Sequence, residues 1–468
     1  MQVQLSDHFT YKRLLRFVLS PILMMIFTSI YSVVDGLFVS NFAGEKPFAA
    51  LNFIYPVIMV LGAVGFMFGA GGTAIVSKTL GEGHRTHANR YFTLVVLVTA
   101  GCGVALGAAG IFAVPSIAHL MGARGEMLDN CVLYARIILI ALPCFMLQNL
   151  FQSFFITAEK PLLGFMFTIG SGVANIALDA LFVVGFKMGL KGAAIATAVS
   201  QTIGGLSPII YFACKNGSLL RFSKPKWYGR IVAKSCVNGS SELVGNIAMS
   251  LVSMIYNVKL LEIAEHNGVS AFGVIMYVQF IFVAIFIGYC IGTAPIVGYN
   301  FGADNKAELQ NVFRKSMIII AVVAVGMIAL SEGLADVIAR LFFSDKLPKK
   351  DMTPEQIAEF LEQMEKLRQM TANGLRLYSI CFLFAGFNMF CSSFFTALNN
   401  GLMSAISSFA RTLVFQIACI FVLPIWLGLN GIWLSTVVAE ALTLILSAVL
   451  FVANNKKYGY VPSKKASA

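Results

Sequence analysis

The chain has 468 residues, of which 58% are hydrophobic and only 12% are charged, and its mean hydropathy is +0.81. Because soluble domains carry roughly 25% charged residues, this composition excludes a soluble globular protein and predicts a membrane protein. The net charge of +12 does not indicate nucleic-acid binding, since the basic residues are spread over short loops between apolar runs.

Twelve apolar segments are each long enough to cross a bilayer as a helix, which needs about 20 residues. In chain order, we expect the spans near residues 14–40, 51–77, 91–113, 131–156, 162–186, 192–213, 231–260, 271–297, 315–340, 374–397, 403–426 and 431–453. The first run exceeds the length of a signal peptide and no small-residue cleavage site follows it, so we expect an uncleaved first span. Most Lys and Arg residues lie in the loops of one side, and the positive-inside rule therefore predicts that both termini are cytoplasmic.

The second half of the chain repeats the first, because identical residues recur 239 positions apart. The pairs are Asn149 and Asn388, Ser153 and Ser392, Phe155 and Phe394, Thr157 and Thr396, Gly189 and Gly428, Gly192 and Gly431, and Thr197 and Thr436. Equivalent residues are an even number of spans apart, so the two repeats are parallel in the membrane. We predict an all-α membrane protein with an N-terminal lobe (1–220), a cytoplasmic linker (221–230) and a C-terminal lobe (231–468) around a central cavity. A duplicated apolar unit of this kind is typical of transporters.

An insertion interrupts the second repeat. Identical pairs before it differ by 221 positions and later pairs by 239, so about 18 residues are added within 344–372. Thr353, Pro354 and Gln356 are suitable residues for an N-cap and a first helical turn. The apolar residues that follow on one helix face are Ile357, Phe360, Leu361, Met364 and Leu367. We expect an amphipathic helix on the outer face that rests on the protein or the membrane interface, in preference to a gating lid.

Ionisable side chains are rare within the expected spans, and each costs roughly 2.5–3.5 kcal/mol at mid-membrane. Asp35 lies late in the first span and Asp179 late in the fifth, where Asn175 shares its helix face; Thr197 lies in the sixth span. We expect these four residues to form an ion site. Two neighbouring carboxylates in a low-dielectric cavity repel each other, so they can take up a proton, or bind Na⁺ with the help of amide oxygens. The alternative is that each Asp only accepts hydrogen bonds between helices.

Other polar residues are expected to line a substrate cavity, namely Tyr31, Asn149, Gln152 and Glu242. The second half does not copy the two aspartates. It carries Arg411 and Glu440 on neighbouring spans instead, and we expect these to form a structural ion pair. Glu242 has two open interpretations, since it can pair with Arg411 or face the cavity.

Four stretches of the sequence resemble the multidrug and toxic compound extrusion (MATE) transporters, in particular the DNA-damage-inducible and staphylococcal-type exporters. They are residues 21–39 with Asp35, residues 72–83, the Asn175–Asp179 segment followed by residues 189–197, and residues 295–303. The resemblance covers nearly the whole chain. It implies two six-helix lobes around a V-shaped cavity and export of organic cations against inward H⁺ or Na⁺. It also implies an ion site at Asp35, Asn175, Asp179 and Thr197, with Tyr31, Asn149 and Gln152 around it.

We therefore expect a secondary antiporter of the cytoplasmic membrane that exports organic cations or drugs by alternating access. We expect it to be a monomer surrounded by lipid, without cofactor, nucleic-acid partner or metal other than a coupling Na⁺. The alternative is a flippase for a lipid-linked oligosaccharide or a phospholipid, which would need Arg or Lys in the cavity where this chain has acidic or neutral residues. An intramembrane enzyme or receptor would need a catalytic constellation or an appended soluble domain, and neither is visible in the sequence.

Overall fold

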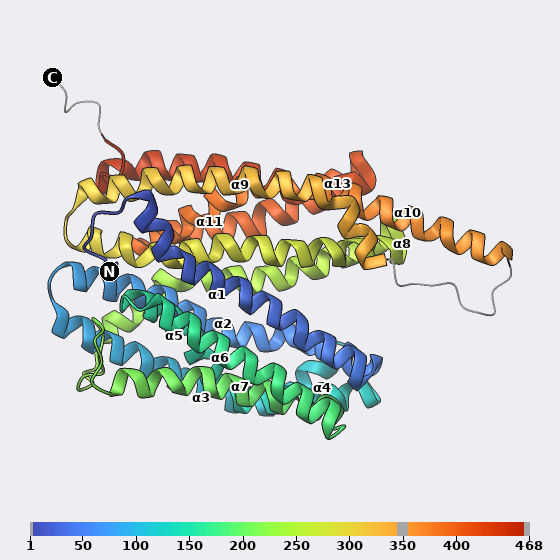
Figure 1. Cartoon of the computed structure of the whole chain (residues 1–468), viewed down its shortest axis with the longest axis horizontal. Helices are drawn as coiled ribbons and strands as arrows, with labels where there is room; N and C mark the ends of the chain where they lie inside the picture. Colours follow the sequence, from blue (N-terminus) through green and yellow to red (C-terminus); the bar gives the residue numbers. More distant parts are fainter. Residues whose placement is uncertain (1–2, 344–353, 463–468) are drawn as a thin grey trace.

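The computed structural model describes residues 3–343 and 354–462, and every regular element within these residues is helical (Figure 1). In this part of the chain, nine helical stretches are long and apolar enough to cross a membrane, and two bent helix pairs bring the number to 11. The last stretch, Gly401–Tyr458, contains two of the expected spans, because Gly428 interrupts it with a φ of 54° and a ψ of −132°. The prediction of an all-α membrane fold is confirmed.

The helices of the first half are followed in two places by π-helical turns, η1 and η2. The elements are α1 (Tyr11–Phe38), η1 (Val39–Ala43), α2 (Glu45–Gly81), α3 (Arg85–Leu120), α4 (Gly125–Ile140), α5 (Leu142–Thr157), α6 (Pro161–Asp179), η2 (Ala180–Gly185) and α7 (Gly189–Ala213). The expected fourth span is the pair α4 and α5, which meet at 56°. Pro143 lies just after the break, and its missing N–H and bulky ring disfavour a straight helix there.

The second half begins with the longest helix, α8 (Gly229–Gly302), and continues with α9 (Lys306–Phe343), α10 (Pro354–Ser379), α11 (Phe382–Ala397), α12 (Gly401–Phe409), η3 (Ala410–Phe415) and α13 (Gln416–Tyr458). Two spans, Gly229–Ala264 and Asn267–Gly302, follow each other within α8. A Cβ on Gly71 would lie 1.9 Å from the carbonyl oxygen of Ser235, and one on Gly81 would lie 2.0 Å from that of Tyr299. Since both ends of α8 thus touch the same region of α2, α8 must fold back on itself.

Helix α1 belongs to both halves of the molecule and crosses diagonally between them (Figure 1). Its first part packs on the second half, where a Cβ on Gly288 would lie 2.5 Å from Cα of Ile22. Its later part packs on α6, where a Cβ on Gly172 would lie 2.6 Å from Cε1 of Phe27. This crossing carries Asp35 to the first half, while the start of the helix stays on the second.

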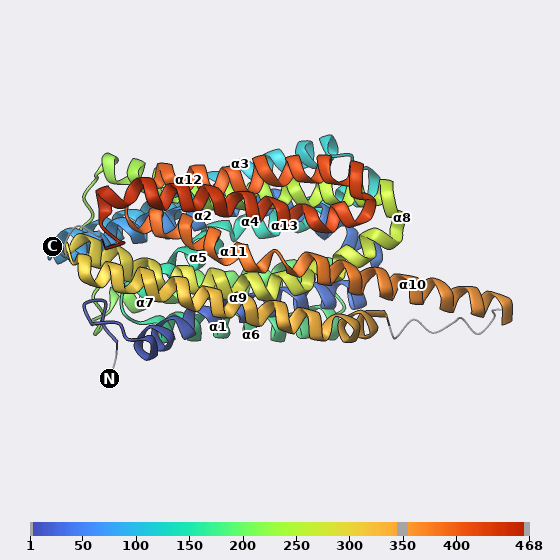
Figure 2. The same ribbon diagram turned by 90° about the horizontal axis from the view of Figure 1, so that it is seen from above.

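The first and last described residues, 3 and 462, lie at the same end of the helix bundle (Figures 1 and 2), which we call the basic end. Arg85 donates hydrogen bonds to the carbonyls of Ser218 and Leu219 in the segment between the halves. In the second half, Gln310 donates a hydrogen bond to the carbonyl of Gly459 near the end of the described chain. The linker predicted at 221–230 lies largely within a non-helical segment, residues 214–228, at this end.

The two halves meet at the basic end through a reciprocal glycine contact between α2 and α8. A Cβ on Gly81 would lie 2.0 Å from the carbonyl oxygen of Tyr299, and a Cβ on Gly302 would lie 2.0 Å from that of Lys78. Gly81 and Gly302 are 221 positions apart, as are Lys78 and Tyr299, so the contact follows the repeat. The backbones can approach this closely only because neither position carries a side chain.

We expect Gly81→Ala to destabilise the protein, because its Cβ would clash with rigid backbone and force α2 and α8 apart. Overpacking of this kind costs about 1–3 kcal/mol. Thermal unfolding in detergent measures the effect. Gly101→Ala is the matched control, since a Cβ there would meet nothing within 4 Å. Equal melting temperatures for the two variants would contradict the tight contact.

The structure differs from the sequence expectation in the register of the repeat. Glu159 and Asn399 occupy equivalent turns with φ values of 59° and 58°, and they are 240 positions apart. Gly189 and Gly428, with φ values of 55° and 54°, keep the offset of 239. The first half therefore has one extra residue between these turns, and the identical pairs in residues 149–157 are shifted by one position from structural equivalence.

The inserted segment does form a helix, but the helix differs from the expected one. α10 continues into the tenth span and projects beyond its neighbours, away from the basic end (Figures 1 and 2). On its apolar face Leu367 is buried, whereas Leu361 is 54% exposed, so the first turns of α10 do not pack fully on the described chain, and their placement at the membrane interface stays a prediction. The proposed N-cap, Thr353, lies outside the described residues.

Candidate functional site

Asp35 on α1 and Asp179 at the end of α6 come together inside the first half. Their carboxyl groups lie close enough to interact directly with each other. Asp179 is fully buried, and Asp35 is half-buried. Within the described chain, neither Asp179 oxygen nor Oδ1 of Asp35 receives a hydrogen bond. Two ionised carboxylates only accept hydrogen bonds, so this contact becomes a hydrogen bond once one of them holds a proton.

Asn175 and Thr197 complete the group of four predicted residues. Asn175 is 1% exposed, and its Nδ2 lies 3.5 Å from Oγ1 of Thr197 on α7. Its Oδ1 receives no hydrogen bond from the described residues. Asn175 lies one helical turn before Asp179 on the same face of α6. The structure thus brings residues from α1, α6 and α7 to one place.

Three tyrosines surround the two aspartates, and two of them were not predicted. Tyr134 on α4 is 3% exposed and lies close enough to both carboxyl groups to interact with them electrostatically. Tyr55 on α2 and the predicted Tyr31 on α1 also interact electrostatically with Asp35. Phenol hydroxyls can donate hydrogen bonds to carboxylates. With 14 tyrosines in the chain, most of them in apolar runs, the sequence offers no signal that selects Tyr55 and Tyr134.

The cluster has more hydrogen-bond acceptors than donors. No Lys or Arg of the described chain forms an ion pair with Asp35 or Asp179, and three of their four carboxyl oxygens are buried without a hydrogen-bond partner there. A buried acceptor without a donor is costly, and a buried unpaired charge is more so. A proton shared by the carboxyl groups, or a small cation coordinated by their oxygens, relieves both costs. The arrangement is chemically suited to reversible cation uptake.

Asn149 and Gln152 both lie on α5, but they face different neighbouring helices. Gln152 lines a small void with Gln148 between α5, α6 and α7. The backbone of Asn149 faces α2, because its carbonyl oxygen would lie 3.5 Å from a Cβ on Gly69. Neither side chain is hydrogen-bonded to the two aspartates in the described chain, so their role in a substrate cavity stays a prediction. The bend before α5 determines which way the side chains of this helix point, and the sequence does not reveal the bend angle.

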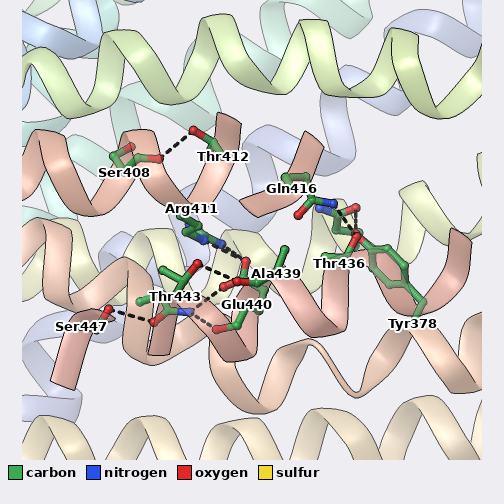
Figure 3. A network of polar contacts seen from close by, with 12 residues as sticks. Tyr378, Ser408, Arg411, Thr412, Gln416, Thr436, Ala439, Glu440, Thr443 and Ser447 are labelled. Carbon is green, nitrogen blue, oxygen red and sulfur yellow. Dashed lines mark hydrogen bonds and ion pairs between the residues drawn. The ribbon is translucent and has the colours of Figure 1, made fainter. Parts of the chain in front are cut away.

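The second half contains a buried ion pair at the predicted position (Figure 3). Nε and one terminal nitrogen of Arg411 bind Oε1 of Glu440 at 2.8 and 2.6 Å. Asn388 donates to Oε2 of Glu440 at 2.7 Å, and Ser447 donates to Oδ1 of Asn388 at 2.9 Å. Glu440 is 5% exposed. The expected structural pair is confirmed, and every carboxylate oxygen in it has a donor.

Where the repeat offset places Asp35, at 35 plus 221, the second half has Tyr256. Its hydroxyl lies 2.7 Å from Oγ1 of Thr436, the equivalent of Thr197. Gln416 donates to both of these oxygens at 2.8 and 2.9 Å (Figure 3). The second half therefore fills the equivalent position with a neutral, hydrogen-bonded group.

Glu242 on α8 has an exposed side chain and forms no ion pair within the described residues. It interacts electrostatically with Arg411, whose hydrogen bonds go to Glu440. Of the two interpretations of Glu242, direct pairing with Arg411 is not observed. Its position at a substrate cavity stays a prediction.

The sequence is similar over nearly its whole length to proteins named Multidrug export protein MepA. The MepA of Staphylococcus saprophyticus is 25% identical over 447 residues, covering 94% of this chain and 93% of that protein. The MepA of a Staphylococcus aureus strain is 24% identical over 450 residues, with the same coverage.

Solved structures share the fold. A crystal structure of MATE in complex with MaL6 matches with a TM-score of 0.89 and 19% identity, covering 97% of this chain and 98% of that one. A MOP superfamily transporter from Pyrococcus furiosus matches with a TM-score of 0.86 and 19% identity over 98% of both chains. The MatE family model matches residues 21–181 and 243–347, which together make up more than half of the sequence. The chain therefore belongs to the MatE family of membrane transporters, with the two-lobed fold of that family.

Proposed function

We propose that the protein is a secondary antiporter that exports organic cations in exchange for H⁺ or Na⁺, with the ion bound at Asp35, Asn175, Asp179 and Thr197. The observation that carries the proposal is the contact between Asp35 and Asp179, whose free oxygens have no cationic partner within the described chain. A structural role would leave these acceptors saturated, as they are in the Arg411–Glu440 pair. The names of the MepA relatives support drug export as the direction of transport.

Exchange requires that ion and substrate favour opposite conformations or compete for the same site. An ion can shift an equilibrium only by binding one state more tightly. Asp35 lies on α1, which crosses between the two halves, and Asp179 lies on α6 of the first half. Neutralising the charge of this pair removes the electrostatic repulsion between the two carboxylates, and it also removes the attraction for a cationic substrate. Ion uptake and substrate release are thereby coupled through α1.

The basic end is proposed to face the cytoplasm of a bacterial cell, with both termini inside. The loops at this end hold the concentration of Lys and Arg that the positive-inside rule requires. Acidic and neutral residues in the candidate ion site favour a cationic substrate over an anionic lipid headgroup.

Reconstitution in proteoliposomes tests the proposal, with a pH gradient and a Na⁺ gradient imposed separately and a lipophilic cationic dye as substrate. We expect one of the two gradients to drive dye transport and the other to have little effect. A fluorescent lipid pyrophosphate serves as the comparison substrate. Movement of the lipid without movement of the dye would identify a flippase and overturn the proposal.

A further inference from the structure

The N-terminal strap, residues 4–9, runs over the basic end and is attached to both halves of the molecule. The backbone N–H of Leu5 donates to Oε1 of Glu159, in the turn between α5 and α6 of the first half, at 2.6 Å. The backbone N–H of Phe9 donates to Oε1 of Glu308, on α9 of the second half, at 2.8 Å. A stretch of five residues therefore joins the two halves.

The second half holds the strap more firmly than the first. Oε2 of Glu308 lies 2.6 Å from Nδ1 of His8. The carbonyl oxygen of Phe9 accepts from Nζ of Lys315 at 2.5 Å and from Nδ2 of Asn311 at 3.0 Å. Lys315 is 7% exposed, and its Nζ also lies 5.3 Å from the centre of the Tyr11 ring, which attracts the ammonium group. When the halves separate, the strap is expected to stay on the second half and to lose its contact with the first.

Apolar contacts add to the attachment. Leu5 and Phe9 are fully buried, although they lie outside every helix. They belong to one core cluster that contains Ile156 of the first half together with residues of α8 and α9. Separation of the halves at this end would expose this apolar surface to water, which opposes opening.

The turn equivalent to that of Glu159 makes a second crossing at the same end. Nδ2 of Asn399, between α11 and α12, donates to the carbonyl oxygen of Ala74 on α2 at 2.8 Å. Oδ1 of Asn399 accepts from Asn238 on α8 at 2.8 Å. The polar side chain of Glu159 in one turn thus binds the strap, and that of Asn399 in the equivalent turn binds the first half.

We propose that the N-terminal strap is a latch that holds the basic end closed, so that its release from the first half is a step in opening this end. The proposal uses the two-lobed transporter fold but not the assignment of the ion site. A failed antiport assay would leave it standing, and its own failure would leave the antiport proposal standing.

Hydrogen–deuterium exchange of the full chain in detergent tests the latch with Leu5→Ala. Alanine lacks most of the leucine side chain and therefore loses its contacts in the shared core. Leu→Ala changes at buried positions shift folding equilibria by at least about tenfold. We expect exchange to be at least about tenfold faster in peptides covering residues 71–81 and 295–302 at the basic end. We also expect slower exchange around Tyr55 and Tyr134, because opening one end closes the other.

Two further variants make the result decisive. Ser6→Ala is the matched control, since Ser6 is exposed in the same segment, and it should exchange like the wild type. Lys315→Met removes the bond to the Phe9 carbonyl but keeps an apolar stem, and it should shift both ends in the same directions as Leu5→Ala. The latch is refuted if Leu5→Ala and Lys315→Met leave the two ends unchanged, or if they accelerate exchange equally at both.

Discussion

Asp179→Asn is expected to reduce gradient-driven export to the background of empty liposomes. Asparagine has nearly the same shape, but it cannot take up a proton or supply a full charge to Na⁺. An ion that no longer binds cannot bias the conformational equilibrium. Because Asp179 is fully buried beside Asp35, the substitution also removes a like-charge contact, so the melting temperature should stay the same or rise. Asp35→Asn should behave in the same way.

Asp304→Asn provides the matched control for Asp179→Asn. Asp304 is an 86% exposed side chain in the turn before α9, with a φ of 50°, which asparagine tolerates well. It should export at the wild-type rate at equal expression. Dye export that remains coupled to an ion gradient in both Asp35→Asn and Asp179→Asn would show that the ion binds elsewhere.

Glu440→Gln is expected to lower the free energy of unfolding by about 3–5 kcal/mol, because it leaves the guanidinium of Arg411, whose side chain is only 21% exposed, without its hydrogen-bonded counter-charge. Arg411 makes both of its side-chain bonds to one oxygen of Glu440, and Asn388 donates to the other oxygen (Figure 3). Glu242 interacts with Arg411 only electrostatically and forms no ion pair with it in the described chain, so it does not replace these bonds. Chemical or thermal unfolding in detergent measures the loss.

The double variant Arg411→Met with Glu440→Gln separates charge from packing. It removes the unpaired cation, while the introduced glutamine amide still offers an acceptor to Asn388, so we expect most of the lost stability to return. Reconstituted Glu440→Gln that remains folded should still couple transport to an ion gradient. A single variant as stable as the wild type would show that the ion pair does not stabilise the fold.

The sequence could predict the charged members of both clusters because charges are rare in apolar spans. Asp35 and Asp179 stand out in their runs, and Arg411 and Glu440 lie on a helical hairpin that brings them together. The spacing of Asn175 before Asp179 determined its side of the helix. These inferences needed only helix periodicity and the cost of burying charge.

Other features depended on angles that local sequence does not determine. After the 56° bend before α5, Gln152 faces a small void between helices. The packing of α2 and α4 brings Tyr55 and Tyr134 close enough to interact electrostatically with Asp35, and tyrosine in an apolar run is too common to be diagnostic. The turns of Glu159 and Asn399 are 240 positions apart, whereas the identical residues before them are 239 apart. The identical residues therefore concealed the true register of the repeat in this region.

The diagonal path of α1 has a consequence for biosynthesis. Its first part packs on Gly288 and Gly292, which are synthesised long after α1 has left the ribosome. At 5–20 residues per second, Ile22 waits on the order of 10–50 s before its partner Gly288 exists. During this interval the nascent chain has to keep that surface in lipid or on a chaperone, so the first half cannot complete its packing until the second half has been made.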